Sequence, residues 1–440
     1  MWTFINLIIL IVLVVWIYRL YATPFIKYRT IAVDWEQNQR YLLNKDMYFL
    51  MFTICTATLF LSPFSLLKYG IWLLVALYVI MEKGRLYIRV DSIVACYLLF
   101  YGWLIIKFIT TAAYSDGAAL LIKYSIPLLF LWVGYKAFDG IYSLYFFNDK
   151  ILKIVVLLIC LIGGISETLY PFVYYGLSSA FLTYAGFSDY LTSLFIVPLV
   201  LFWITKKKIY LMGAAIFFLS VVLESVRTAI GGMFLSVCFA FFFKYKIKSL
   251  PYLFVGIMAF LSVILFVPSV NEKMFGEEKA GAVTMNDVVE NDALSMDNIQ
   301  TSGRSYFWDL TLKKFYEPNR LKGSGLGSVT AFTKSKSVIK FVFLLHSDYV
   351  QILCDSGLIG LWLLILFYVS VILKVFKKLI MEKTSQITMY TGIMAVSSLA
   401  GVAFSMGFDN VVSHSMTSLI NPFIFLGFFI KSVDLSNKIK

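Results

Sequence analysis

Long apolar segments alternate with short polar ones along the chain. Apolar runs of roughly 17–25 residues are long enough to cross a bilayer as helices, which satisfy their own backbone hydrogen bonds in lipid. The third apolar run (69–82) is short, and the eighth and ninth (209–224 and 229–243) lie close together. We therefore expect 12 or 13 spans in an all-α polytopic membrane protein. The predicted spans are residues 3–21, 47–66, 69–82, 92–111, 118–137, 151–170, 188–205, 209–224, 229–243, 250–268, 346–373, 386–406 and 417–431.

One polar segment, residues 269–345, is far longer than the others. A connection of this length is usually functional. It divides the chain into an N-terminal transmembrane bundle (1–268), a large loop (269–345) and C-terminal transmembrane helices (346–440). Within the loop, "SYFWDLTLKKFYEP" places apolar side chains at helical spacing, which predicts a short amphipathic helix ended by Pro318. The following "GSGLGS" predicts a flexible glycine turn.

Composition and charge agree with this pattern and orient it. The chain is 60% hydrophobic and 14% charged, too few charges for the surface of a soluble protein of this length. The net charge of +13 gathers in short loops that fall on one side of the predicted spans, and basic loops are typically cytoplasmic. The long loop, with ten basic and nine acidic residues, then lies outside. No basic domain suited to nucleic acid occurs, and the five cysteines form no CxxC pair.

A histidine stands at the outer end of the eleventh span, in "LLHSDYVQILCDSGLIGL". His346 is one of only two histidines in the chain, and an imidazole can accept a proton near neutral pH. In a helix starting here, His346 and Tyr349 share a face, and Asp348 lies about 200° away, so we do not expect Asp348 to be the direct partner of His346. The alternative is a helix cap or interface histidine without a catalytic role.

Two arginines are predicted at the same outer face. Arg227 lies between the eighth and ninth spans, and Arg304 precedes the short helix of the long loop. A guanidinium group fits phosphate oxygens, so both are candidates to bind a phosphate-bearing substrate. The alternatives are an ion pair between Arg227 and Glu224, three residues earlier, and a solvated loop position for Arg304.

The chemistry that these groups suit is a transfer from a lipid-linked phosphate to a hydroxyl group. No DxD or HExxH motif indicates a metal site, and no Walker or Rossmann glycine pattern indicates a nucleotide. We therefore expect no metal and no cofactor, with the energy carried by an activated donor such as a sugar pyrophosphate. His414, in the last outer loop, and Arg320, in the long loop, are weaker candidates for the same pocket.

The segment 303–362 resembles the signature region of the O-antigen ligase and polymerase superfamily. In that pattern a Gly-Arg pair precedes an aromatic-rich helix, a glycine turn follows, and a histidine leads a tyrosine-containing helix. The upstream "ESVRTAIGG" resembles another family segment, with Arg227 as its arginine. The family more often has other residues at Val226, Ser347 and Asp355. The matching positions are Gly303, Arg304, Trp308, Gly323 to Gly327, His346, Ser347, Tyr349, Asp355, Gly357 and Gly360.

The resemblance implies a metal-independent, inverting glycosyltransferase of the GT-C kind in the bacterial cytoplasmic membrane. Its substrates would be undecaprenyl-pyrophosphate-linked glycans at the outer face. Arg227 and Arg304 would bind and neutralise the pyrophosphate, and His346 would be the base on the acceptor hydroxyl or would orient it. We expect further substrate contacts from Arg320, Tyr349, Tyr306, Asp348 and His414.

The resemblance leaves two enzymes open. One is a polymerase of O-antigen, capsular or exopolysaccharide repeat units; the other is a ligase that passes finished glycan to lipid A core or another acceptor. We favour the polymerase because abundant Lys, Ile, Phe and Tyr suggest an AT-rich bacterial genome, where such polymerases are common. A flippase and a chain-length regulator are then expected partners, besides membrane lipids. A lipid-linked oligosaccharide transporter is the non-enzymatic alternative, and it would predict mid-membrane charges and an internal repeat, neither of which we find.

Overall fold

The structure is a computed structural model. It describes residues 90–138, part of 140–159, 184–223, 226–271 apart from 269, 304–335, 345–382, 384–414 and 418–439, besides the single residue Val15. The predicted spans at 3–21, 47–66 and 69–82 lie outside the described residues, and so does most of 151–170.

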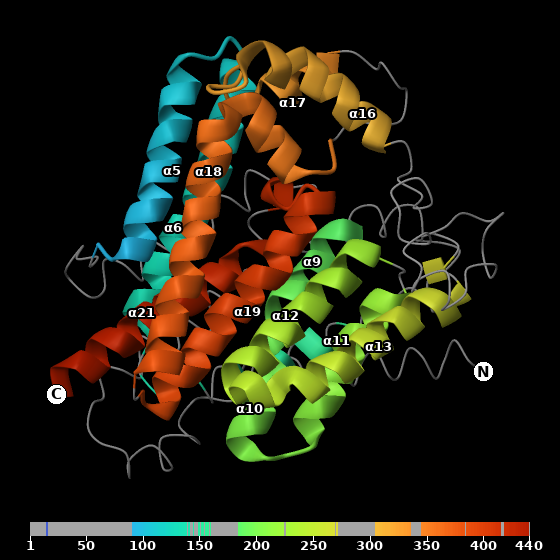
Figure 1. The fold of residues 1–440 in the computed structure, drawn as a ribbon, viewed down its shortest axis with the longest axis vertical. Coiled ribbons are helices and arrows are strands. Elements are labelled where there is room, and N and C mark those ends of the chain that lie inside the picture. The colour runs from blue at the N-terminus through green and yellow to red at the C-terminus, as the bar shows by residue number, and fades with distance from the viewer. Residues whose placement is uncertain are drawn as a thin grey trace.

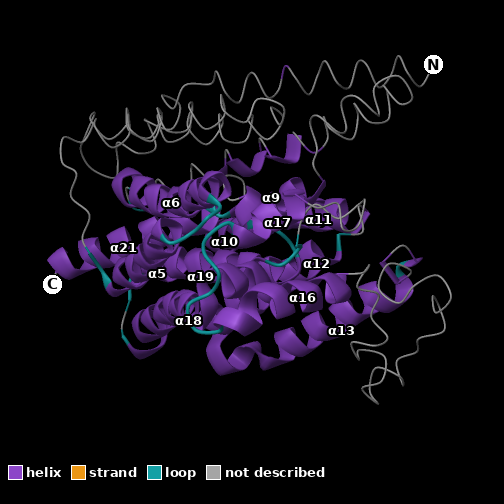
Figure 2. Cartoon of the chain, turned by 90° about the horizontal axis from the view of Figure 1, so that it is seen from above, coloured by secondary structure: helices purple, strands orange, loops and turns teal. Residues whose placement is uncertain are grey.

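The elements that the structure describes are helices, and these parts of the chain contain no strand (Figure 2). Short non-α turns join several of them: Lys246–Ser249, Leu312–Tyr316, Glu317–Asn319, Lys377–Met381 and Val412–His414. The α-helices are α5 (Ser92–Ile109), α6 (Tyr114–Ala137), α9 (Tyr184–Leu194), α10 (Ile196–Thr205), α11 (Ile209–Leu223), α12 (Arg227–Tyr245), α13 (Leu250–Phe266), α16 (Arg304–Thr311), α17 (Ser328–Ser335), α18 (Asp348–Phe376), α19 (Gln386–Phe408) and α21 (Ile420–Ile439).

Six helical segments within the described residues are long and apolar enough to cross a membrane. This confirms the prediction of an all-α polytopic membrane protein. The shorter apolar helix α11 accompanies them. The six segments are Ser92–Ile109, Tyr114–Lys136, Ser188–Thr205, Arg227–Phe266, Asp348–Met381 and Gln386–Phe408.

The predicted span 188–205 corresponds to the membrane-length helical segment Ser188–Thr205. Phe195 separates α9 from α10 in this segment but keeps helical backbone angles, with φ −58° and ψ −27°. Pro198 has no N–H to donate to the carbonyl of Leu194, four residues earlier, so one helical hydrogen bond is missing at this point.

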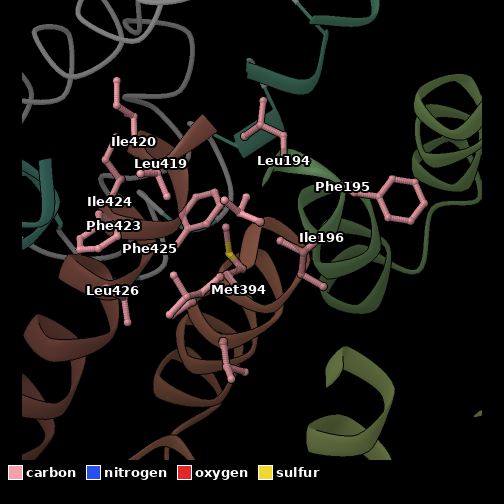
Figure 3. Packing of buried hydrophobic residues seen from close by; sticks show 14 of the residues in the cluster. Leu194, Phe195, Ile196, Met394, Leu419, Ile420, Phe423, Ile424, Phe425 and Leu426 are labelled. Carbon is pink, nitrogen blue, oxygen red and sulfur yellow. The ribbon is translucent and has the colours of Figure 1, made fainter. Parts of the chain in front are cut away.

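Helix α19 lies at the centre of the described bundle. It packs against α12 and α21, while α6 packs on α21 and α18 packs on α5. Where α12 crosses α19, a Cβ atom added to Gly232 would lie 2.7 Å from the carbonyl oxygen of Gly401, so the two backbones meet directly. Small residues allow this close approach between membrane helices. Figure 3 shows part of the apolar core, with side chains from α9, α10, α19 and the start of α21 lying together.

The two ends of the bundle differ in charge. Helices α16 and α17 lie at the end where α18 begins, and the connections from α10 to α11 and from α18 to α19 lie at the other end (Figure 1). Lys244 belongs to this second end: its Nζ donates to the Tyr390 hydroxyl at 2.9 Å and lies over the Trp203 ring. As predicted, the basic connections described by the structure share one end, which carries Lys206, Lys207, Lys208, Lys244, Lys246, Lys248, Lys377 and Lys378.

Candidate active site

The long loop contributes a short helix, and its existence is confirmed. Helix α16 begins at Arg304, continues through the turns 312–316 and 317–319, and contains Pro318 in the last of them. Phe307 of α16 is buried in a small apolar cluster with Leu345 and Cys354. The indole Nε1 of Trp308 donates to the carbonyl oxygen of Leu345 at 2.7 Å. Helix α16 therefore fixes the chain immediately before His346.

His346 lies before α18 rather than in its first turn. Its φ is +54°, a left-handed conformation that is uncommon for a residue other than glycine. Ser347 is extended and caps the helix, because its Oγ accepts a hydrogen bond from the Val350 N–H at 3.4 Å. The prediction that His346 and Tyr349 share a helix face is therefore wrong. The backbone N–H of His346 donates to Oδ1 of Asn410 at 3.0 Å, which helps to hold the unusual conformation.

The first residues of α18 bind the segment that follows α19. Asp348 is buried, and its Oδ2 accepts a hydrogen bond from the Val412 N–H at 2.9 Å. The Tyr349 hydroxyl donates to the carbonyl oxygen of Ala403 at 2.7 Å. Asp348 thus holds the segment after α19 beside His346, whereas Tyr349 ties α18 to α19 itself. The imidazole Nδ1 pairs with another carboxylate, so Asp348 is not its partner, as expected. That either residue contacts a substrate stays a prediction.

The imidazole of His346 pairs with a carboxylate from the segment after α19. Its Nδ1 lies 3.3 Å from Oδ1 of Asp409, and the two side chains are 33% and 10% exposed. Burial would raise the pKa of the Asp409 carboxyl. The hydrogen bonds from His346 and from the Asn410 N–H, with the charges of His346 and Arg304, nevertheless hold this pKa below its ordinary value. With the Nδ1 hydrogen assigned to this pair, Nε2 is left to accept a proton.

Both arginines lie at the same end of α19. Nη1 of Arg304 donates to the carbonyl oxygen of Phe408 at 2.6 Å, so its guanidinium group caps the helix end where cations are favoured. Arg304 and His346 thus bind the adjacent residues Phe408 and Asp409. Arg227, half-buried at the start of α12, interacts electrostatically with Arg304. The alternative ion pair with Glu224 falls on a residue outside the described ones.

The glycine turn of the signature is a packed structural element and not the flexible turn that we predicted. Gly323, Gly325 and Gly327 have φ values of +69°, +112° and +87°. The Asp355 carboxylate accepts hydrogen bonds from the Gly327 N–H at 3.0 Å and the Val329 N–H at 3.1 Å, at the start of α17. Helix α18 opens at Gly357, with φ +71°, to receive this turn. The turn fixes α17 against α18 and contributes no side chain to the His346 site.

The remaining candidates are less well placed by the structure. Arg320 is exposed in the turn before the glycines, where its carbonyl oxygen accepts a hydrogen bond from the Leu358 N–H at 2.9 Å. Tyr306 lies on α16 and His414 ends the turn 412–414, and both side chains lie outside the described residues. Substrate contacts by these three residues stay predictions.

Sequence reasoning did not identify Asp409 as the partner of His346. We considered Asp409 only as a neighbour of His414. The available signal was the polar pair Asp409-Asn410 directly after an apolar run, which resembles the position of His346 before one. Asn410 shares this signal, and its side chain receives the His346 N–H.

Comparison with known proteins adds one finding. Residues 212–365 match the model of a family described as O-antigen ligase. The match spans α11 to the middle of α18, so it includes Arg227, Arg304 and His346 and ends before Asp409. No curated protein matches the chain significantly.

Proposed function

The chain belongs to the O-antigen ligase and polymerase superfamily, and from this premise we propose that it polymerises undecaprenyl-pyrophosphate-linked oligosaccharide repeat units at the outer face of the bacterial cytoplasmic membrane. The product would be an O-antigen, a capsule or an exopolysaccharide. The superfamily also contains ligases, so a ligase is the alternative function.

The charge of the bundle ends supports the outer location. Basic residues concentrate at the end of α10, the end of α12 and the end of α18, and positive loops are typically cytoplasmic. The His346 site lies at the opposite end, beside α16 and α17 (Figure 1). Lipid-linked glycans presented at the outer face would meet this end of the protein.

The two arginines supply the groups that a pyrophosphate leaving group needs. Arg227 and Arg304 interact electrostatically as like charges, and the charge of Arg304 also acts on the Asp409 carboxylate. An anion that binds both arginines would relieve their repulsion. Negative charge grows on the pyrophosphate as its bond to the sugar breaks, so cationic groups held in place stabilise the transition state more than the ground state.

His346 and Asp409 supply the base. In the proposed step the acceptor hydroxyl oxygen attacks the anomeric carbon of the donor sugar, and the bond from that carbon to the pyrophosphate oxygen breaks with its electron pair. The hydroxyl proton passes to Nε2 of His346, and Asp409 stabilises the resulting imidazolium across 3.3 Å. A single displacement of this kind inverts the anomeric configuration, and it needs no metal.

The observation that carries the proposal is the pairing of Arg304 and His346 with adjacent residues, Phe408 and Asp409. A group for the leaving side and a base for the attacking side thus meet at one helix end, as one reacting centre requires. The ligase would use the same centre, so the acceptor distinguishes the two functions.

We would test the proposal in the native strain carrying His346→Ala at normal expression, by a glycan ladder gel with analysis of the carrier lipid. We expect the ladder to vanish and single repeat units on undecaprenyl pyrophosphate to accumulate. Long chains that persist on the carrier without reaching their final acceptor would instead show a ligase. An unchanged ladder with unchanged attachment would refute the catalytic role of His346.

A further inference from the structure

A buried carboxyl group lies behind the His346–Asp409 pair. Asp189, in α9, is 1% exposed, and neither of its oxygens has a hydrogen-bond partner in the part of the chain that the structure describes. It interacts electrostatically with Asp409 and with Asp348. Buried polar groups without partners are rare in native proteins and usually mark a bound water or a functional role.

Two further unsatisfied polar atoms belong to the end of α19 and the residues that follow it. The Ser405 hydroxyl, which interacts with Asp189 without an ordinary hydrogen bond, is buried and unpaired among the described residues, and so is Nδ2 of Asn410. Ser405 and Asp409 lie one turn apart, since the Asp409 N–H donates to the Ser405 carbonyl at 2.8 Å. Asp189 therefore lies beside the last turn of α19, from which the Asp409–Asn410 segment continues.

The surroundings favour the uncharged acid form of Asp189. An unpaired carboxylate that is buried away from water is unstable, and two neighbouring carboxylates add repulsion. Helices α19, α12, α11 and α21 pack against α9. Among the described residues, Asp409 and Asp348 act on Asp189, and the cationic groups Arg227 and Arg304 and the imidazole of His346 lie at the same end of the bundle. Other titratable groups of these helices bond elsewhere: Tyr210 to Asp149, Lys244 to Tyr390, and Asp434 to Tyr135.

We propose that Asp189 is a positioning residue of the transfer site, which acts through Asp409 and must stay an uncharged acid. As a polar group beside Ser405 in the last turn of α19, it holds the Asp409–Asn410 segment that orients His346. As a neutral group, it adds no further negative charge beside Asp409. A second negative charge here would oppose the positive charge that binds pyrophosphate.

The proposal rests on the proposed function and is tested on the full-length protein in lipid nanodiscs. The probe is the undecaprenyl-pyrophosphate-linked repeat unit from a strain that lacks the enzyme, and the rate of chain growth is measured against pH. We expect Asp189→Asn, which is neutral, similar in size and still a donor, to keep at least about half of the wild-type rate. We expect Asp189→Leu, which has no polar group, to lose at least about tenfold.

A pH profile separates this role from simple packing. At alkaline pH the wild type should lose affinity for the lipid-linked donor as Asp189 ionises, seen as a rising KM, and Asp189→Asn should not show this rise. Asp149→Asn is the matched control, because Asp149 is a buried carboxyl whose oxygens bind Tyr210 and Lys153 at the other end of the bundle. This control should keep the wild-type alkaline rise.

Three results would overturn the proposal: an inactive Asp189→Asn at wild-type abundance, a fully active Asp189→Leu, or an alkaline rise in KM that Asp189→Asn retains. If Asp189→Leu does not fold, the profile of Asp189→Asn decides alone. A His346→Ala protein that still elongates chains would refute the proposed function itself, whatever the Asp189 variants do.

Discussion

Replacing Asp409 by asparagine removes the negative charge beside His346 and keeps the size of the side chain. The asparagine oxygen can still accept hydrogen bonds from His346 and from the residue 410 N–H, which Asp409 now receives at 3.3 and 2.8 Å. The variant therefore tests the charge of the pair rather than its shape. The charge matters in the transition state, where His346 becomes an imidazolium.

The size of the effect follows from the geometry. At the 3.3 Å separation of Nδ1 and Oδ1, two unit charges interact by about 5 kcal/mol at an effective dielectric constant of about 20, and by about 1.3 kcal/mol at about 80. Because the His346 side chain is 33% exposed, solvent screens the pair to an intermediate value. A loss of about 2–3 kcal/mol of transition-state stabilisation corresponds to a rate about 30- to 150-fold lower.

The assay is chain elongation by the purified protein in nanodiscs, with the lipid-linked repeat unit as donor and acceptor. We expect the loss to appear mainly in kcat, because the imidazolium forms only during transfer. Asp309→Asn is the control, since Asp309 is an exposed carboxylate of α16 that pairs with Lys313 at 2.6 Å. A rate for Asp409→Asn within twofold of wild type, at equal abundance, would refute the role given to the pair.

Two further variants test the anion site and the glycine turn. Arg304→Lys keeps the charge but loses the planar fork, so we expect at least about a tenfold higher KM for the lipid-linked donor. An unchanged KM would exclude Arg304 from pyrophosphate binding. Gly357→Ala places a Cβ at φ +71° and 2.6 Å from the Gly323 nitrogen, so it should destabilise the protein by about 1–3 kcal/mol in thermal unfolding in detergent. Gly102→Ala, where an added Cβ meets nothing within 4 Å, is its control, and equal melting temperatures would contradict the close packing of the turn against α18.

Much of this protein could be predicted from local patterns in the sequence. Hydropathy identified the helices α5, α6, α12, α13, α18 and α19 because a membrane span is defined by its own length and composition. The helical spacing of aromatic residues predicted α16 in the same way. Arg227, Arg304 and His346 stood out because polar groups at the outer ends of apolar runs are few. Each of these features is encoded within one short segment.

The arrangement of the site was decided by tertiary packing. His346 and Asp409 are 63 residues apart, and no local pattern pairs them. Asp189 lies within a predicted span, and nothing in the hydropathy pattern relates it to Asp409. The signature glycines suggested flexibility, but contacts with α18 hold them in place. Sequence alone thus determined which segments enter the membrane and which residues could react. The crossing of α9, α12, α18 and α19 decided which of these residues meet, because contacts between residues far apart in the chain depend on how the helices pack.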